Sequence, residues 1–150
     1  MTVNSDSILV TGATGYVGGR LVPALLKAGF RVRAMARNLG KVGFRPWVGD
    51  SRVELVQGDV LDLESLKDAA SGCRAAYYLV HSMIAQKEKF VEADRRAARH
   101  MVEAAAAAGL ERIIYLGGLA ETKDGILSKH LQSRIEVAEI LQSGPVPTTD

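Results

Sequence analysis

The sequence contains one cysteine, little net charge and no long apolar run, and each absence excludes a class of protein. Because Cys73 is the only cysteine, an internal disulfide framework is excluded, and we expect a cytoplasmic location. No segment approaches the roughly 18 apolar residues of a membrane-spanning helix, and no targeting segment is visible. A formal net charge of only +2, dispersed along the chain, gives no basis for nucleic-acid binding. No pairing of histidines, Cys73 and carboxylates has metal-ligand spacing.

What the sequence does contain is a regular alternation of short apolar runs and longer periodic segments. With 47% hydrophobic and 24% charged residues, the 150-residue chain has the composition of one globular domain. The pattern predicts strands at residues 7–11, 31–36, 53–57, 75–80 and 112–116, and helices at residues 16–28, 62–70, 86–108 and 126–142. Such alternation predicts an α/β fold, with a parallel sheet covered by helices on both faces.

Two segments depart from this regular pattern. Residues 38–51 include three glycines and a proline, so no clear helix is expected there, and Trp47 within them is expected to be a packing anchor. At the other end, residues 144–150 follow the last helix where a further strand would begin. We therefore expect residues 1–150 to be one domain, the N-terminal part of a longer and apparently truncated protein.

A glycine-rich loop joins the first expected strand to the first expected helix. Thr11-Gly-Ala-Thr-Gly-Tyr-Val-Gly18 places glycines at positions 12, 15 and 18, in GxxGxxG spacing. Gly12 permits a tight turn, Gly15 lets the backbone approach a phosphate group, and Gly18 lets the helix pack against the strand. The helix then presents free N–H groups and its positive dipole end to an anion. This order of elements predicts a dinucleotide-binding loop; the alternative is a structural turn that binds no ligand.

The residue at the end of the second strand indicates which dinucleotide would bind. NAD-binding proteins usually place an acidic residue about 20 positions beyond the loop, where it holds the ribose 2′-hydroxyl. Here Arg37 occupies that place, and an arginine pairs with a 2′-phosphate that a carboxylate would repel. We therefore expect NADP(H), with NAD as the alternative if Arg37 is only a solvated charge. Asp59 and Val60, after the third strand, are candidates for contact with adenine, although Asp59 could instead cap a turn.

Four segments carry a resemblance to a known superfamily: ILVTGATGYVGGRL at 8–21, GDVLD at 58–62, AYYLVHSM at 76–83 and EAAAAAGLERIIYLGGL at 103–119. Over nearly its whole length the chain resembles the short-chain dehydrogenase/reductase superfamily, most closely the NAD-dependent epimerase/dehydratase-like and NmrA-like branches. The resemblance implies a Rossmann-type doubly wound parallel sheet. It also implies that the pyrophosphate is held by Gly12, Thr14, Gly15, Tyr16, Val17 and Gly18, the adenosine phosphate by Arg37, the adenine by Asp59 and Val60, and the ribose and nicotinamide path by Leu79, Val80 and His81.

The catalytic positions implied by the resemblance carry unusual residues. Active members of the superfamily use a Tyr-x-x-x-Lys pair on the helix after the fifth strand, but here His130 stands in the tyrosine position and Arg134 in the lysine position. The two lie on one helical face, so His130 could act as an acid or base; the alternative is a surface histidine beside a surface arginine. The fifth strand ends without the assisting hydroxyl, and Tyr115 within it is expected in the core. His100, beside several arginines, is expected to be solvated.

Three functions are compatible with these residues. We favour an NADP(H)-dependent oxidoreductase or epimerase/dehydratase-like enzyme with a non-standard catalytic site and an unknown small-molecule substrate, because most of the superfamily are enzymes. The alternatives are a catalytically inactive NmrA-like regulator that senses the dinucleotide, and a structural subunit. The alanine-rich helix at 86–108 would suit close packing in a homodimer, and would equally suit packing on its own sheet.

Overall fold

The computed structural model describes residues 7–80, 87–117 and 129–150; for residues 87–90, 129 and 130 it describes the backbone alone. The strands are β1 (Ser7–Val10), β2 (Arg31–Ala36), β3 (Val53–Gln57), β4 (Ala75–Tyr78), β5 (Arg112–Tyr115) and β6 (Thr148–Thr149). The helices are α1 (Tyr16–Lys27), α2 (Leu39–Val42), the 3-10 helix η1 (Pro46–Gly49), α3 (Leu63–Ala70), α4 (Lys87–Ala108) and α5 (Lys129–Ser143). The five predicted strands and four predicted helices are thus present, and the strand expected after the last helix is β6.

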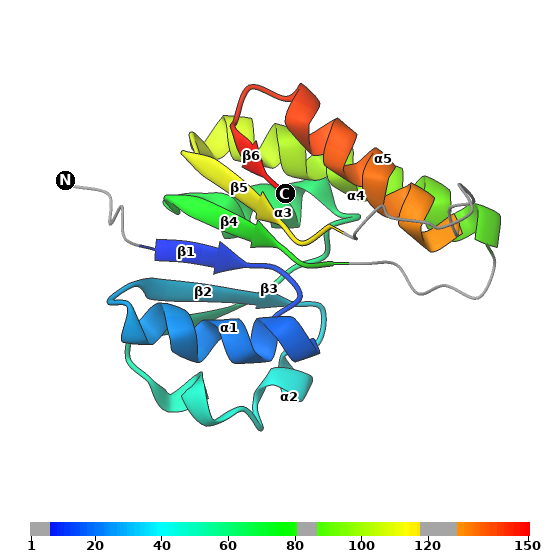
Figure 1. The fold of residues 1–150 in the computed structure, drawn as a ribbon. Coiled ribbons are helices and arrows are strands. Elements are labelled where there is room, and N and C mark those ends of the chain that lie inside the picture. The colour runs from blue at the N-terminus through cyan, green and yellow to red at the C-terminus, as the bar shows by residue number, and fades with distance from the viewer. Residues whose placement is uncertain (1–6, 81–86, 118–128) are drawn as a thin grey trace.

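The six strands form one parallel sheet in the order β3-β2-β1-β4-β5-β6. Figure 1 shows α1 and α2 on one face of this sheet and α3, α4 and α5 on the other. The order of strands reverses between β1 and β4, because the chain runs outward to β3, crosses back and then continues outward to β6. This is the doubly wound arrangement that the resemblance implied, and it has the parallel sheet with helices on both faces that the alternation of elements predicted.

Glycines follow two of the main helices. Gly29 after α1 has a φ of +96°, and Gly109 after α4 has a φ of +66°. An L-residue with a side chain is strained in this left-handed region, which is why glycine commonly follows a helix. At the N-terminus of α3, the side chain of Asp62 accepts a hydrogen bond from Ser65 N at 3.4 Å, so Asp62 is the N-cap of this helix.

Two hydrophobic clusters pack on opposite faces of the sheet, because alternate residues of a strand point to opposite sides. In β1, Ile8 and Val10 contribute to the cluster under α1, whereas Leu9 contributes to the cluster under α3, α4 and α5. The first cluster is called here the α1 layer and the second the α4 layer. The α1 layer includes Trp47, which is 6% exposed and is therefore the packing anchor predicted for it.

The apolar face of α1 differs from the pattern in the sequence. Its buried residues are Gly18, Val22, Leu25 and Leu26. The spacing in the sequence predicts a different buried face, made of Val17, Leu21, Ala24, Leu25 and Ala28. Val17, however, is 42% exposed. The helix is rotated because Gly18 packs against the preceding loop, which turns the buried stripe by one residue relative to the prediction.

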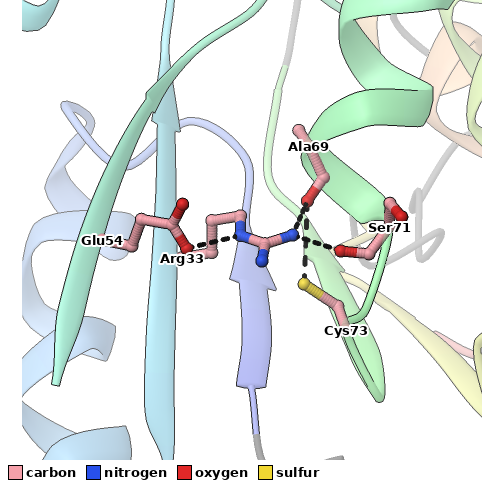
Figure 2. A network of polar contacts seen from close by, with 5 residues as sticks. All are labelled: Arg33, Glu54, Ala69, Ser71 and Cys73. Carbon is pink, nitrogen blue, oxygen red and sulfur yellow. Dashed lines mark hydrogen bonds and ion pairs between the residues drawn. The ribbon is translucent and has the colours of Figure 1, made fainter. Parts of the chain in front are cut away.

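A charged side chain ties β2 to the turn after α3. Arg33 shares the face of β2 that lies under α3, and its side chain is 17% exposed. Its Nε donates to Glu54 Oε2 at 3.0 Å, while its Nη1 donates to Ala69 O at 2.8 Å and to Ser71 O, as Figure 2 shows. The two carbonyls lie at the C-terminus of α3, where a helix has unsatisfied acceptors. Arg33 thus caps the end of α3 from a neighbouring strand.

The same turn buries the one cysteine of the chain. Cys73 Sγ donates to Ala69 O at 3.6 Å, and burial raises the pKa of its thiol.

Within the described residues, no helix is long and apolar enough to cross a membrane.

Candidate functional site

An open pocket of about 400 Å³ lies at the carboxyl ends of the strands, beside the boundary between β1 and β4. Doubly wound sheets bind their ligands in this crevice, because the loops on either side of the reversal diverge and leave space between them. The lining comes from every loop at this edge up to α4: Gly12, Thr14, Met35, Ala36, Arg37, Gly58, Asp59, Val60, Leu61, Leu79, Val80, Ala93, Asp94 and Ala97.

The glycines of the loop after β1 are required by its geometry. Gly12 has a φ of +69°, and a Cβ atom there would lie 3.2 Å from the carbonyl oxygen of Leu79. A Cβ atom on Gly18 would lie 2.4 Å from the carbonyl oxygen of Gly12, a distance no real side chain tolerates. The first turn of α1 therefore lies directly against the loop, as only glycine at position 18 permits.

The N-terminus of α1 has nothing in its own sequence to neutralise it. The N-cap residue Gly15 offers no side-chain hydrogen bond, and the first turn has no acidic residue. The first residues of the helix, Tyr16 and Val17, are 72% and 42% exposed. A helix end of this kind presents its N–H groups and the positive end of its dipole to an external anion.

Thr11 holds the two strands at the pocket in register. The residue is fully buried, its Oγ1 donates to Tyr77 O at 3.0 Å, and the same oxygen accepts from Leu79 N at 3.1 Å. The side chain therefore continues the β1–β4 pairing beyond Val10, the last residue of β1. This explains why β4 ends at Tyr78 and not at residue 80 as predicted: Leu79 pairs with a side chain because the neighbouring strand has ended.

The end of β2 and the loop after β3 bring Arg37 and Asp59 to the same pocket. Arg37 has an exposed side chain, and its carbonyl oxygen accepts from Gln57 Nε2 at 3.2 Å. Asp59 Oδ1 accepts from Leu61 N at 2.9 Å, so Asp59 does cap a turn. The turn and the pocket roles are compatible, because the carboxylate has a second oxygen and the residue lines the pocket.

Helix α4 supplies the remaining wall of the pocket. Ala93 and Ala97 lie one turn apart and line the pocket together with Asp94, whose Oδ2 accepts from Ser133 Oγ of α5 at 3.0 Å. One turn further along, His100 Nδ1 lies 2.7 Å from Val60 O. His100 is half-buried, so the expectation that it is solvated is wrong. It joins α4 to the loop that follows β3.

The two tyrosines at the ends of β4 and β5 belong to the core. Tyr78 and Tyr115 are each 2% exposed, and their ring centroids are 6.0 Å apart. Burial raises the pKa of Tyr115 to about 12, with Arg134 opposing the shift and Asp94 adding to it. Burial, together with the charge of Asp94, also raises the pKa of Tyr78. Both phenols are therefore neutral at physiological pH, and Tyr115 is a core residue as predicted.

Of the cofactor residues predicted from the sequence, Gly12, Thr14, Arg37, Asp59, Val60, Leu79 and Val80 line the pocket. Gly15, Tyr16, Val17 and Gly18 form the turn and the exposed helix end beside it, and His81 lies outside the described residues. The structure adds Met35, Ala36, Gly58, Leu61, Ala93, Asp94 and Ala97 to the lining. Ala36, Gly58 and Leu61 are adjacent to predicted residues, and Met35 is two positions from Arg37. The three residues of α4 could not be predicted, because they have the spacing of an ordinary core face.

The two catalytic candidates stand on α5. His130 is in its first turn, and its side chain lies outside the described part of the chain. Arg134 is half-buried and does not line the pocket; its charge acts on Tyr115, whose pKa it lowers. The guanidinium of Arg134 therefore lies near the phenol of Tyr115, at the end of β5.

A parallel sheet of this order, with a glycine loop, an exposed helix end and a pocket at the reversal, defines a Rossmann-type nucleotide-binding protein. The chain belongs to the NmrA-like family, whose model matches residues 4–149. This confirms the resemblance and the fold class predicted from the sequence.

Individual relatives have different activities. The chain is 30% identical over 122 residues to cinnamoyl-CoA reductase 1 of Petunia hybrida, covering 79% of this chain and 37% of the reductase. It is 32% identical over 117 residues to the photosystem II assembly factor Ycf39 of Cyanophora paradoxa, covering 78% of this chain and 36% of that factor. The chain therefore spans little more than a third of these relatives.

Solved structures show the same fold. The triphenylmethane reductase of Citrobacter superposes with a TM-score of 0.77 at 25% identity, over 95% of this chain and 47% of that chain. A second structure of that reductase is a complex with NADP(H), and superposes with a TM-score of 0.75 at 24% identity.

Proposed function

We propose that the pocket binds NADP(H) and that the chain is the cofactor-binding part of an oxidoreductase or epimerase/dehydratase-like enzyme. One observation carries the proposal. The structure gathers into one pocket a glycine loop at a bare helix N-terminus, an arginine at the end of β2 and a carboxylate after β3. These three features match the pyrophosphate, the adenosine phosphate and the adenine amino group of the dinucleotide.

The residues present fit this cofactor. Gly12 and Gly18 leave no side chain between the loop and α1, so a pyrophosphate can approach the N–H groups of the helix. The adenine would lie among Val60, Leu61 and Ala97, with Asp59 accepting from its amino group. When bound, the nicotinamide supplies or accepts a hydride, and the role of this chain's residues is to hold and orient it.

Arg37 supports the preference for NADP(H). Its exposed side chain stands at the rim of the pocket, where NAD-binding proteins place a carboxylate. A guanidinium there can make a bidentate contact with a 2′-phosphate. The NADP(H) complex of the Citrobacter reductase, which has the same fold, also supports this choice.

A second function is supported by the residues on α5. His130 and Arg134 replace the tyrosine and lysine that the superfamily uses, while the pocket is complete in its cofactor features. This combination fits a regulator that binds NADP(H) and passes its redox state to a partner, and one relative of the chain is a photosystem II assembly factor. For the enzyme, His130 would be the acid or base and Arg134 its neighbour, acting on a small-molecule substrate.

The cofactor proposal is tested by calorimetric titration of the purified chain with NADPH and with NADH. In wild type we expect NADPH to bind more tightly. Arg37→Ala removes a charged hydrogen-bond pair worth about 1.5–3 kcal/mol, so NADPH affinity should fall about 10- to 100-fold while NADH affinity stays unchanged. Arg31→Ala is the matched control, because Arg31 is exposed at the opposite end of β2 and should change neither affinity. Equal loss of both cofactors in Arg37→Ala would contradict the assigned contact.

The enzyme and the dinucleotide-sensing regulator are distinguished by comparing NADP⁺ with NADPH and by testing for turnover. A sensor must bind NADP⁺ and NADPH with clearly different affinities, since otherwise it has nothing to report. A reductase would oxidise bound NADPH in the presence of a carbonyl substrate, whereas an epimerase or dehydratase would change its substrate and leave the cofactor in its original redox state. In either case His130→Gln should abolish the turnover without changing NADPH affinity.

A further inference from the structure

The short segment after β2 reaches back to the glycine loop through two side chains. Arg45 Nη2 donates to Thr14 O at 2.7 Å, and Trp47 Nε1 donates to Gly19 O at 3.1 Å. Both contacts join the α2–η1 segment to residues of the loop or of the first turns of α1. The sequence pattern suggests no role for Arg45, because it is separated from Thr14 by 31 positions.

The contact of Arg45 fixes one peptide group of the loop at both ends. Thr14 O accepts from Arg45, and the N–H of the same peptide, on Gly15, donates to Gly12 O at 3.0 Å. The orientation of this peptide sets the direction of the amides that follow it at the start of α1. Thr14 itself lines the pocket, so the peptide fixed by Arg45 lies at the proposed pyrophosphate position.

A glycine outside the GxxGxxG motif makes room for the arginine. A Cβ atom on Gly19 would lie 2.9 Å from Arg45 Nη1 and 3.0 Å from Arg45 Cζ. Gly19 is inside α1, where glycine costs about 1 kcal/mol relative to alanine. The motif does not require a glycine at this position. The guanidinium of Arg45 occupies the space that a side chain on residue 19 would fill.

We propose that Arg45, seated on Gly19, is a positioning residue that holds the glycine loop ready for the pyrophosphate. This rests on the proposed function, since it assigns a role within the same cofactor site. Arg45 acts through the Thr14–Gly15 peptide and not on the adenosine phosphate. It therefore strengthens the binding of NADPH and NADH equally, whereas Arg37 separates the two. Ordering the loop before binding lowers the entropy that the cofactor must overcome.

Gly19→Ala is the first test, because it should separate affinity from stability. The three atoms nearest the new methyl group all belong to the guanidinium of Arg45, at the far end of a flexible side chain, so we expect Arg45 to be displaced while the backbone stays in place. We expect NADPH and NADH affinity each to fall about tenfold, equivalent to about 1.4 kcal/mol, by calorimetry. We expect the thermal midpoint to stay the same or rise, because alanine favours the helix.

Arg45→Met and the double variant complete the cycle. Arg45→Met keeps a long apolar stem but cannot donate to Thr14 O, so it should weaken both cofactors about as much as Gly19→Ala does. In the Arg45→Met background, Gly19→Ala should have no further effect, because there is no guanidinium left to displace. Arg45→Lys retains a charge and a donor, and should recover part of the affinity.

Three results would overturn the inference. Loss of NADPH affinity alone would show that Arg45 contacts the 2′-phosphate directly. Additive effects of Gly19→Ala and Arg45→Met would show that residue 19 does not act through Arg45. The third concerns amide hydrogen exchange without cofactor: exchange at Gly15 and Tyr16 that is the same in Arg45→Met and wild type would show that the loop needs no positioning. Because this readout needs no cofactor, it decides the inference even if wild type bound neither dinucleotide and the proposed function failed.

Discussion

Thr11 offers the sharpest test of how the pocket is held together. Thr11→Val preserves the shape of the side chain and removes its hydroxyl. The variant leaves the N–H of Leu79 without its acceptor, and removes one of the two donors, Thr11 N and Oγ1, that Tyr77 O now has. Leaving a buried donor unsatisfied costs about 1–3 kcal/mol, so we expect a loss near 2 kcal/mol. For a domain of this size that corresponds to a fall in Tm of about 4–8 °C.

Thr11→Ser is the matched control, because it keeps the hydroxyl and loses only a methyl group. The removed methyl accounts for about 0.8 kcal/mol, with a small addition for the cavity, so its Tm should fall by about 2–4 °C. Both variants are measured by thermal and urea unfolding, with NADPH affinity in parallel. Affinity should fall in Thr11→Val, since Leu79 lines the pocket.

The relative stability of Thr11→Val and Thr11→Ser decides whether the hydrogen bonds of Thr11 hold the two strands together. If Thr11→Val were as stable as wild type, or if Thr11→Ser were the less stable of the two, the hydrogen bonds would not hold the strands. The position would then depend on packing alone.

Two further predictions concern stability away from the pocket. Arg33→Met should lower the free energy of unfolding by about 1–3 kcal/mol, because Ser71 O loses its Arg33 donor and Ala69 O keeps only the weak donor Cys73 Sγ. Glu54→Gln should cost under about 1 kcal/mol, since the Glu54 side chain is 62% exposed. Equal losses of stability in urea unfolding would show that the ion pair, and not the end of the helix, determines the effect. Tyr115 has a folded pKa of about 12 against an ordinary 10, so its contribution of about 3 kcal/mol is complete below pH 10 and is lost as pH rises toward 12. In Tyr115→Phe, the free energy of unfolding should therefore fall less steeply between pH 9 and 12 than in wild type, and the remaining pH dependence is due to Tyr78. The same pH dependence in both proteins would show that the pKa of Tyr115 is not raised.

Much of the fold could be predicted from the sequence because the decisive signals are local. Buried parallel strands are short apolar runs, so β2 and β3 agree with the predicted bounds to the residue. The glycine loop could likewise be predicted, since its conformation depends on residues six apart in the chain. Arg37 and Asp59 could be placed in the pocket because strands that run in parallel end at the same edge.

The remaining site residues depend on contacts between distant segments. His100 lies beside Val60, 40 positions away, and no periodicity within α4 distinguishes it from its solvated neighbours. Arg45 likewise acts on a loop 31 positions earlier. The buried face of α1 was wrong by one residue because the contact between Gly18 and the loop, and not the helix pattern alone, fixes its rotation.

The division of the core into an α1 layer and an α4 layer has a consequence for redesign. Arg37, which would choose between cofactors, and the Arg45–Gly19 pair, which would hold the loop for either one, belong to segments that join β2 to β3 or lie on α1. Figure 1 shows α1 and α2 on one side of the sheet. The candidates for chemistry, His130 and Arg134, stand on α5 on the other side. The sheet between them acts as a partition, so substitutions that exchange one dinucleotide for another need not disturb the packing behind the reactive end. Cofactor preference and chemistry should therefore be adjustable one at a time.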